Sequence, residues 1–268
     1  MSGNRHTFLT NQDFQISPVG FGIAQQPSEL IEEADSLRQE GHIDGATALY
    51  LTALADNPSC RVTHQRLTKV LRGYELPDKL LDQACQCCIE LVNCQPDSQD
   101  ALENLSYVLL RQRRVQQANE CVQELCYKRV QEMHPEFLRQ CWPGSSCIVP
   151  QFMVIGAMKC EMTSLYSYLI NHPRIISATR KEVRFFNCPW SRACEIEFYK
   201  SFFPPLPTDG GYLTGEATPA YLRLPSVPND VRATFPNTQL IVVPRNPVQR
   251  AVSQYYFSVR RGNQGRST

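Results

Sequence analysis

The chain has 268 residues, of which 42% are hydrophobic and 20% are charged, so it can bury one large core or two ordinary ones and is neither disordered nor collagen-like. Its net charge of +1 hides an asymmetry, because residues 1–149 carry six more acidic than basic residues and residues 150–268 carry seven more basic than acidic ones. This division predicts two domains, the second of which faces an anion. The basic residues are scattered without an aromatic–basic recognition motif, which favours a small phosphate or sulfate ligand over nucleic acid.

Two further properties follow from composition. No apolar run approaches the roughly 20 residues that span a bilayer, and residues 1–6 lack the basic-then-apolar plan of a signal peptide, so we expect a cytoplasmic protein without a membrane span. The five histidines do not flank the twelve cysteines at zinc-finger spacing. Reduced, buried thiols are therefore expected instead of disulfides or metal ligands.

The first half of the chain has a polar start and then a helical pattern. Residues 1–27 contain proline and glycine and show no period, which predicts a flexible lead-in. From residue 28 to about residue 140 the apolar spacing is helical. The small residues Ala34 and Ala46, on either side of the helix breaker Gly41, would let two antiparallel helices approach closely.

The helical pattern also repeats. Ala46 has counterparts at Ala84 and Ala118, 38 and then 34 residues further on. Residues 28–140 therefore resemble an all-α array of tetratricopeptide (TPR) repeats, whose period is about 34 residues, and the resemblance implies a protein or peptide partner on the concave face. Arg72 stands where a small residue is expected, so the second unit departs from the pattern. An irregular helical array without the groove stays open as the alternative.

Turn-forming residues near 141–146 mark a boundary, after which the pattern changes. The expected elements are strands at 152–155, 175–176 and 240–243 and helices at 163–171 and 248–260. Strands that alternate with helices predict a mostly parallel α/β sheet over residues 150–268.

The first motif with chemical content is a strand that ends at Gly156, a short loop with Lys159, and a helix that opens with Thr163 and Ser164. Unpaired N–H groups and the positive end of the dipole make a helix start attractive to an anion, and the lysine adds a full charge. The motif is not a Walker A loop, because no second glycine precedes a Lys-Ser/Thr pair, and a nucleotide kinase is disfavoured. Taken alone, the motif also fits an ordinary strand–helix turn.

The second motif has the same plan: a strand ends at Pro244, Arg245 follows, and Ser253 lies eight residues later on the next helix. Arginine can grip phosphate with two parallel N–H bonds, and the hydroxyl adds a donor. Together the motifs resemble the sulfotransferases that use 3′-phosphoadenosine 5′-phosphosulfate (PAPS). These enzymes have a P-loop-like parallel sheet and hold the 5′-phosphosulfate on a Lys-x-Gly-Thr/Ser-Thr/Ser loop and the 3′-phosphate on an arginine and a serine. The resemblance implies the PAPS-binding residues Lys159, Cys160, Thr163, Ser164, Arg245 and Ser253.

A third stretch, residues 180–187, resembles the Lys-Glu-x-His-Phe-Phe-Asp segment of the heparan-type branch of that family, in which the glutamate is the catalytic base. The matching residue is Glu182. Arg184 replaces the histidine and Asn187 replaces the aspartate, and because these positions face the acceptor in that branch, its acceptor does not carry over. Residues 215–222 resemble the Gly-Glu-x-Ser/Thr-Pro-x-Tyr-Leu element that lines the same cleft.

The resemblance implies in-line transfer of a sulfuryl group from PAPS, the co-substrate, to a hydroxyl or amine acceptor, leaving PAP. Lys159 would stabilise the charge that develops on the bridging phosphate oxygen, Glu182 would take the acceptor's proton, and no metal would be needed.

Two departures from the family pattern shape the expectation. Glu161 and Met162 replace a glycine and a hydroxyl residue of the loop, which predicts weakened PAPS binding, since a carboxylate would lie beside the phosphosulfate. The resemblance ends near residue 260, so the second domain is expected to be C-terminally truncated. The alternative is a non-catalytic interaction module of TPR type with a degenerate sulfotransferase remnant.

Overall fold

The computed structural model describes residues 27–142, 149–187, 196–208 and 210–260. The predicted lead-in therefore lies outside the described residues, except for Pro27, which opens the first helix. The first half of the chain is helical, as the spacing predicted. Its helices are α1 (Pro27–Glu40), α2 (Ile43–Asp56), α3 (Arg61–Gly73), α4 (Asp78–Cys94), α5 (Gln99–Arg111), α6 (Val115–Met133) and α7 (Pro135–Gln140).

The break between the first two helices follows from Gly41, whose φ of +93° is a left-handed conformation that favours glycine. Ala34 and Ala46 are fully buried, so α1 and α2 pack closely. Beyond this pair, α2 contacts α3 and α4, both of these pack on α5, and α5 packs on α6. The contacts thus join helices that are next to each other or next but one along the chain. The TPR assignment itself stays a prediction.

The second half forms a four-stranded parallel sheet in the order β2-β3-β1-β4, which confirms the predicted sheet. The strands are β1 (Phe152–Gly156), β2 (Ile175–Ser177), β3 (Leu213–Ala217) and β4 (Gln239–Val242). The helices are α8 (Met162–Ile170), α9 (Ile196–Lys200), α10 (Val227–Thr234) and α11 (Pro247–Arg260), with a 3₁₀ turn at Tyr221–Arg223.

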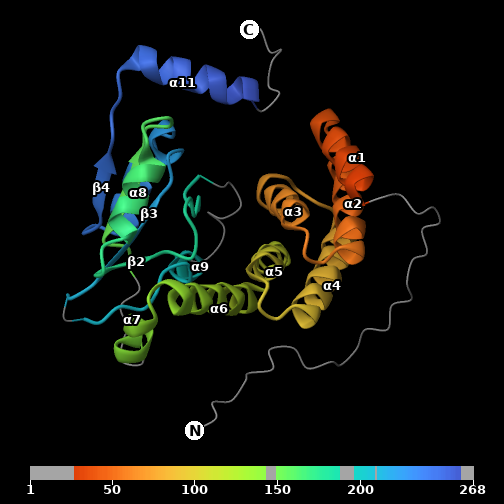
Figure 1. Ribbon diagram of the computed structural model, residues 1–268, viewed down its shortest axis with the longest axis horizontal. Helices are drawn as coiled ribbons and strands as arrows, with labels where there is room; N and C mark the ends of the chain where they lie inside the picture. Colours follow the sequence, from red (N-terminus) through yellow and green to blue (C-terminus); the bar gives the residue numbers. More distant parts are fainter. Residues whose placement is uncertain (1–26, 143–148, 188–195, 209, 261–268) are drawn as a thin grey trace.

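The central strand β1 packs on two layers because its side chains alternate between the two faces of the sheet. Phe152 and Val154 join an apolar cluster with residues of α8, whereas Met153 and Ile155 join a core that continues into the helical half. Gly215 lies opposite Phe152 in the sheet, and a Cβ there would approach the Phe152 carbonyl oxygen to 2.3 Å, so β3 can pair closely only with glycine at this position. The sheet thus lies between α8 on one face and the helical half on the other (Figure 1).

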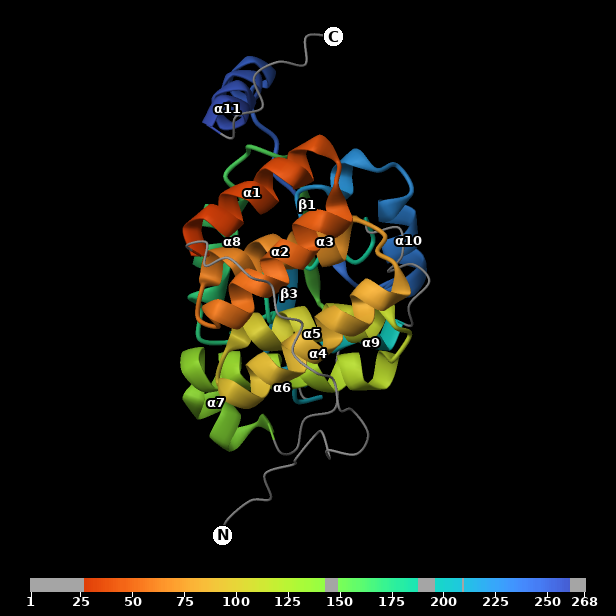
Figure 2. The same ribbon diagram turned by 90° about the vertical axis from the view of Figure 1, so that its right-hand side faces the viewer.

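One edge of the sheet, which β4 forms, is exposed. Edge strand β4 has no buried residue, and neither has α11, which projects beyond the body of the protein in both views (Figures 1 and 2).

Among the described helices, none combines the length and apolar character that crossing a bilayer needs. The cysteines of the described ranges carry free thiols, and burial raises the pKa of Cys126 to about 12.

Candidate active site

The loop between β1 and α8 carries the first predicted motif. Lys159 and Glu161 both have left-handed φ angles, +67° and +59°, and Glu161 is the residue that precedes the first turn of α8. Cys160 is buried, and its thiol donates to the carbonyl oxygen of Met158. Met162 is also buried and packs in the cluster beneath α8, so its side chain fills the core instead of facing the loop.

The second motif lies beside the first. Arg245 follows β4, which pairs with β1, and its Nη1 donates to the carbonyl oxygen of Lys159 at 3.1 Å. The ammonium of Lys159 lies 4.2 Å from the ring centroid of Phe257 on α11. Ser253 is one helical turn before Phe257, so it lies on the same face of α11. The structure therefore brings Lys159 and Arg245 together at one edge of the sheet, and Ser253 lies on the face of α11 whose Phe257 meets Lys159.

Glu161 also enters this group. Its carboxylate lies 3.8 Å from Nη1 of Arg245, and its side chain is 76% exposed. It makes no cap bond to the α8 backbone. The acidic residue that replaces the loop glycine is thus paired with the arginine of the second motif.

The two hydroxyl residues at the start of α8, Thr163 and Ser164, are both exposed. Thr163 accepts a hydrogen bond from the ammonium of Lys181 at 2.7 Å, so the loop is joined to the segment that carries Glu182. Ser164 lies next along the exposed side of the helix. Lys181 was not among the residues singled out from sequence, although it lies next to one of them.

Glu182 is held between two cations. Arg184 donates to its Oε2 from Nε at 2.9 Å and also from Nη2, and the ammonium of Lys181 lies 3.6 Å from its Oε1. Burial acts to raise the pKa of Glu182, but the hydrogen bonds and charge of Arg184, with the charge of Lys181, outweigh it and lower the pKa below its ordinary value. The carboxylate therefore stays ionised at neutral pH, with Oε1 the less tightly bound oxygen.

Beneath this segment lies a fully buried carboxylate, that of Glu216 on β3. Its Oε1 accepts from the hydroxyls of Tyr199 at 2.8 Å and Tyr221 at 3.0 Å, and its Oε2 accepts from the hydroxyl of Thr218 at 2.6 Å and the N–H of Val183 at 3.2 Å. Burial raises the pKa of Glu216 although all four bonds lower it.

Sequence resemblance placed residues 215–222 in the cleft without a chemical reason, and this network supplies one. Thr218 also accepts from the N–H of Arg184 at 3.3 Å. The end of β3 thus holds the two peptide N–H groups on either side of the Val183 Cα. Tyr199 could not have been found from spacing, since it comes from a different element, α9.

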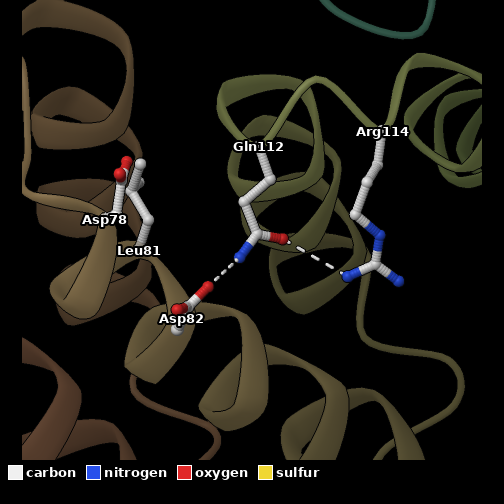
Figure 3. Close-up of a pocket in the computed structure, with 5 residues that line it drawn as sticks. All are labelled: Asp78, Leu81, Asp82, Gln112 and Arg114. Carbon is white, nitrogen blue, oxygen red and sulfur yellow. Dashed lines mark hydrogen bonds between the residues drawn. The ribbon is translucent and has the colours of Figure 1, made fainter.

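A cavity of about 370 Å³ lies elsewhere, in the helical half, and is lined by Asp78, Leu81, Asp82, Gln112 and Arg114. Figure 3 shows that Gln112 bridges its two sides: its amide donates to Asp82 at 2.7 Å, and its oxygen accepts from Arg114 at 3.3 Å. Asp78 and Asp82 belong to α4, which lies across the molecule from β4 (Figure 1), so the cavity is separate from the site. In the described parts of the chain, no group of three or more His, Cys, Asp or Glu side chains is arranged to hold a metal ion.

Curated proteins that are similar to this chain include sulfotransferases. No protein-family model matches the chain. Over 136 residues it is 35% identical to the "Membrane-associated sulfotransferase kil1" of Dictyostelium discoideum, which covers 50% of this chain and 28% of the relative. Over 106 residues it is 37% identical to human "Heparan sulfate glucosamine 3-O-sulfotransferase 6", covering 40% of this chain and 30% of the relative.

Among solved structures, a sulfotransferase from Alicyclobacillus acidocaldarius aligns with 45% of this chain and 54% of its own, at 29% identity and a TM-score of 0.37. The chain spans less than a third of the length of the two curated relatives above. The homologues of this chain are sulfotransferases, and the similarity covers about half of it.

Proposed function

We propose that this protein binds PAPS and transfers its sulfuryl group to a hydroxyl or amine acceptor. The observation that carries the proposal is the contact between Arg245 and the backbone of Lys159, because it gathers two cationic side chains and a helix start at one sheet edge. This donor set fits an anion with two phosphate groups. The sulfotransferase homologues support the same chemistry.

PAPS, when bound, supplies the sulfuryl group, and the bond from sulfur to the bridging phosphate oxygen breaks as the bond to the acceptor forms. Lys159 would leave the Phe257 ring and place its ammonium at the bridging oxygen, where negative charge develops. Arg245 and Ser253 would hold the 3′-phosphate, and the backbone N–H groups at the start of α8, with Thr163 and Ser164, the phosphosulfate. Cys160 would position this loop from its buried place.

Glu182 would accept the proton that the acceptor loses as it attacks sulfur. Oε1 is the oxygen suited to this, because Lys181 lies 3.6 Å away, beyond good hydrogen-bond distance, whereas Oε2 is held by Arg184. The carboxylate carries its negative charge at neutral pH, which a base requires.

A second function has its own supporting observation. Glu161 pairs with Arg245, which occupies part of the arginine's capacity to hold phosphate. This contact favours a non-catalytic interaction module, in which the helical half would bind a protein partner and the sheet would only support it.

Calorimetric titration of the chain with PAP, PAPS and ATP separates the proposals. Binding of PAP and PAPS but not ATP supports the sulfotransferase site, and binding of none supports the interaction module. Transfer of labelled sulfate from PAPS would then be measured with a panel of three acceptors: desulfated heparin, suggested by the names of the relatives, a phenol and a primary alcohol. Failure to bind PAP at millimolar concentration would contradict the proposed function.

A further inference from the structure

The segment that carries Glu182 lies between the two halves of the protein and is held from both (Figure 1). The N–H of Val183 donates to Glu216 on β3 at 3.2 Å, and the carbonyl oxygen of Val183 accepts from Nη2 of Arg72 on α3 at 3.2 Å. The residue next to the predicted base is therefore fixed at its N–H by the sheet and at its C=O by the helical half.

The backbone of this segment requires such support. Glu182 and Arg184 have left-handed φ angles of +63° and +61°, which neither residue type favours. A conformation of this kind persists only where surrounding contacts over-determine it. Val183, between the two, is the residue at which those contacts converge.

The helical half holds the segment at a second point. Arg180 donates to the hydroxyl of Tyr107 at 3.1 Å and forms an ion pair with Glu103, both on α5. The guanidinium of Arg72 lies 5.4 Å from the centroid of the Tyr107 ring, so both arginines contact Tyr107, Arg72 at the ring and Arg180 at the hydroxyl. Arg72 and α5 thus form one contact surface against residues 180–183.

We propose that Arg72 is a positioning residue for Glu182: it extends from the helical half to hold the Val183 carbonyl and so keeps the Glu182 carboxylate in place for proton transfer. This inference rests on the proposed function. It gives a reason for the departure noted in the repeat pattern, where Arg72 replaces a small residue. A small side chain at this position of α3 could not reach the Val183 carbonyl.

The proposal predicts a specific kinetic pattern. In Arg72→Met the aliphatic stem remains and the donor is lost, so kcat for the best acceptor of the panel should fall about tenfold, while the Kd for PAP stays within twofold, since Lys159 and Arg245 are untouched. Arg72→Lys retains a donor and should recover kcat to within about threefold of the unmodified protein. Arg61→Met is the matched control on the same helix, because Arg61 is 79% exposed and lies 3.9 Å from Asp100, away from residues 180–183; it should change neither value.

Amide hydrogen exchange gives a readout that does not depend on turnover. In Arg72→Met, peptides covering residues 182–186 should exchange about tenfold faster, with α8 and α11 unchanged. If Arg72→Met does not fold, Arg72→Gln, whose amide is too short to reach Val183, replaces it.

The outcomes separate this inference from the proposed function. Unchanged kcat and unchanged exchange in Arg72→Met would overturn the inference while leaving sulfuryl transfer intact. An equal loss of kcat and PAP affinity, with faster exchange everywhere, would also overturn it, because it would mean general destabilisation. If the unmodified protein transfers no sulfate, the proposed function fails, and the exchange comparison alone decides whether Arg72 holds the segment.

Discussion

Nη1 of Arg245 donates to the carbonyl oxygen of Lys159 at 3.1 Å, although 86 residues separate them in the chain. The contact exists because β1 and β4 are parallel neighbours, so that the loops following both strands leave the sheet at the same edge. One side chain therefore ties together the loops that would hold opposite ends of the nucleotide.

Arg245→Met should weaken PAP binding by roughly 10- to 100-fold, since a charge-assisted hydrogen bond contributes about 1.5–3 kcal/mol. The PAP affinity of Arg245→Lys should lie between those of the unmodified protein and Arg245→Met, because lysine keeps the charge but loses the paired hydrogen-bond geometry of arginine. Calorimetric titration measures both. Arg250→Met is the control, because Arg250 lies nearby on α11 and its side chain is exposed. Equal affinities for the unmodified protein and Arg245→Met would contradict the assigned role.

Glu161→Gln should tighten PAP binding by about two- to fivefold at low salt, because it removes an exposed negative charge near the anion site and frees Arg245. The gain should shrink as salt is raised, since screening weakens interactions between exposed charges. Glutamine isolates the charge effect, whereas glycine would also relieve the left-handed φ of this residue. Met162 should be left in place because it is buried. Glu90→Gln, on exposed α4 surface, is the control, and an unchanged or weaker affinity in Glu161→Gln would refute the expectation.

Glu182→Gln should lower kcat by about 100-fold or more without changing the Kd for PAP. The pKa of Glu182 is lowered, so the acid limb of the kcat profile should lie below pH 4.5. Arg184→Met should move this limb to higher pH, because Arg184 contributes most to holding the pKa down. The pH dependence of single-turnover rates tests both statements. An acid limb that Arg184→Met leaves in place would show that another group titrates.

Glu216→Gln tests the buried network through stability. The pKa of Glu216 is raised by burial, so its protonated form is favoured in the folded state, and the stability that this provides is present below about pH 4.5 and is lost as pH rises through the folded-state pKa. The difference in unfolding free energy between the unmodified protein and Glu216→Gln should therefore decrease from pH 5 to pH 8, by about 1.4 kcal/mol for each unit by which the pKa is raised.

Urea unfolding at several pH values measures this difference. Glu197→Gln serves as the control, because Glu197 is 59% exposed and pairs with Lys200. A difference that is constant over the range, or that increases, would mean that Glu216 is ionised without cost in the folded protein.

Much of the fold followed from local pattern. The strands at 152–155 and 240–243 and the helices that follow them appear within a residue or two of the expected positions, because continuous apolar runs and proline or glycine boundaries act within a few residues. The first helix pair followed from Gly41 and two small residues. The repeat family, the domain boundaries and the roles of the site residues stay predictions.

Other features were outside the reach of any local pattern. The buried cluster around Glu216 draws on α9, β3 and the 3₁₀ turn, which approach one another only when the sheet closes. Arg72 read from sequence as an imperfection in a repeat, and its contact with Val183 spans 111 residues. Met162 read as a lost hydroxyl donor, whereas its side chain packs in the core.

The sequence by itself determined which residue types are present and where strands give way to loops and helix starts, since these depend on the chain's own neighbours. Only the tertiary structure decided that Arg245 meets the backbone of Lys159 and that Arg184 holds the Glu182 carboxylate. It also decided that Glu216 and Arg72 hold the neighbouring residue, Val183. The reason is physical: a charged side chain acquires its partners and its pKa from whatever distant elements packing brings within a few ångströms.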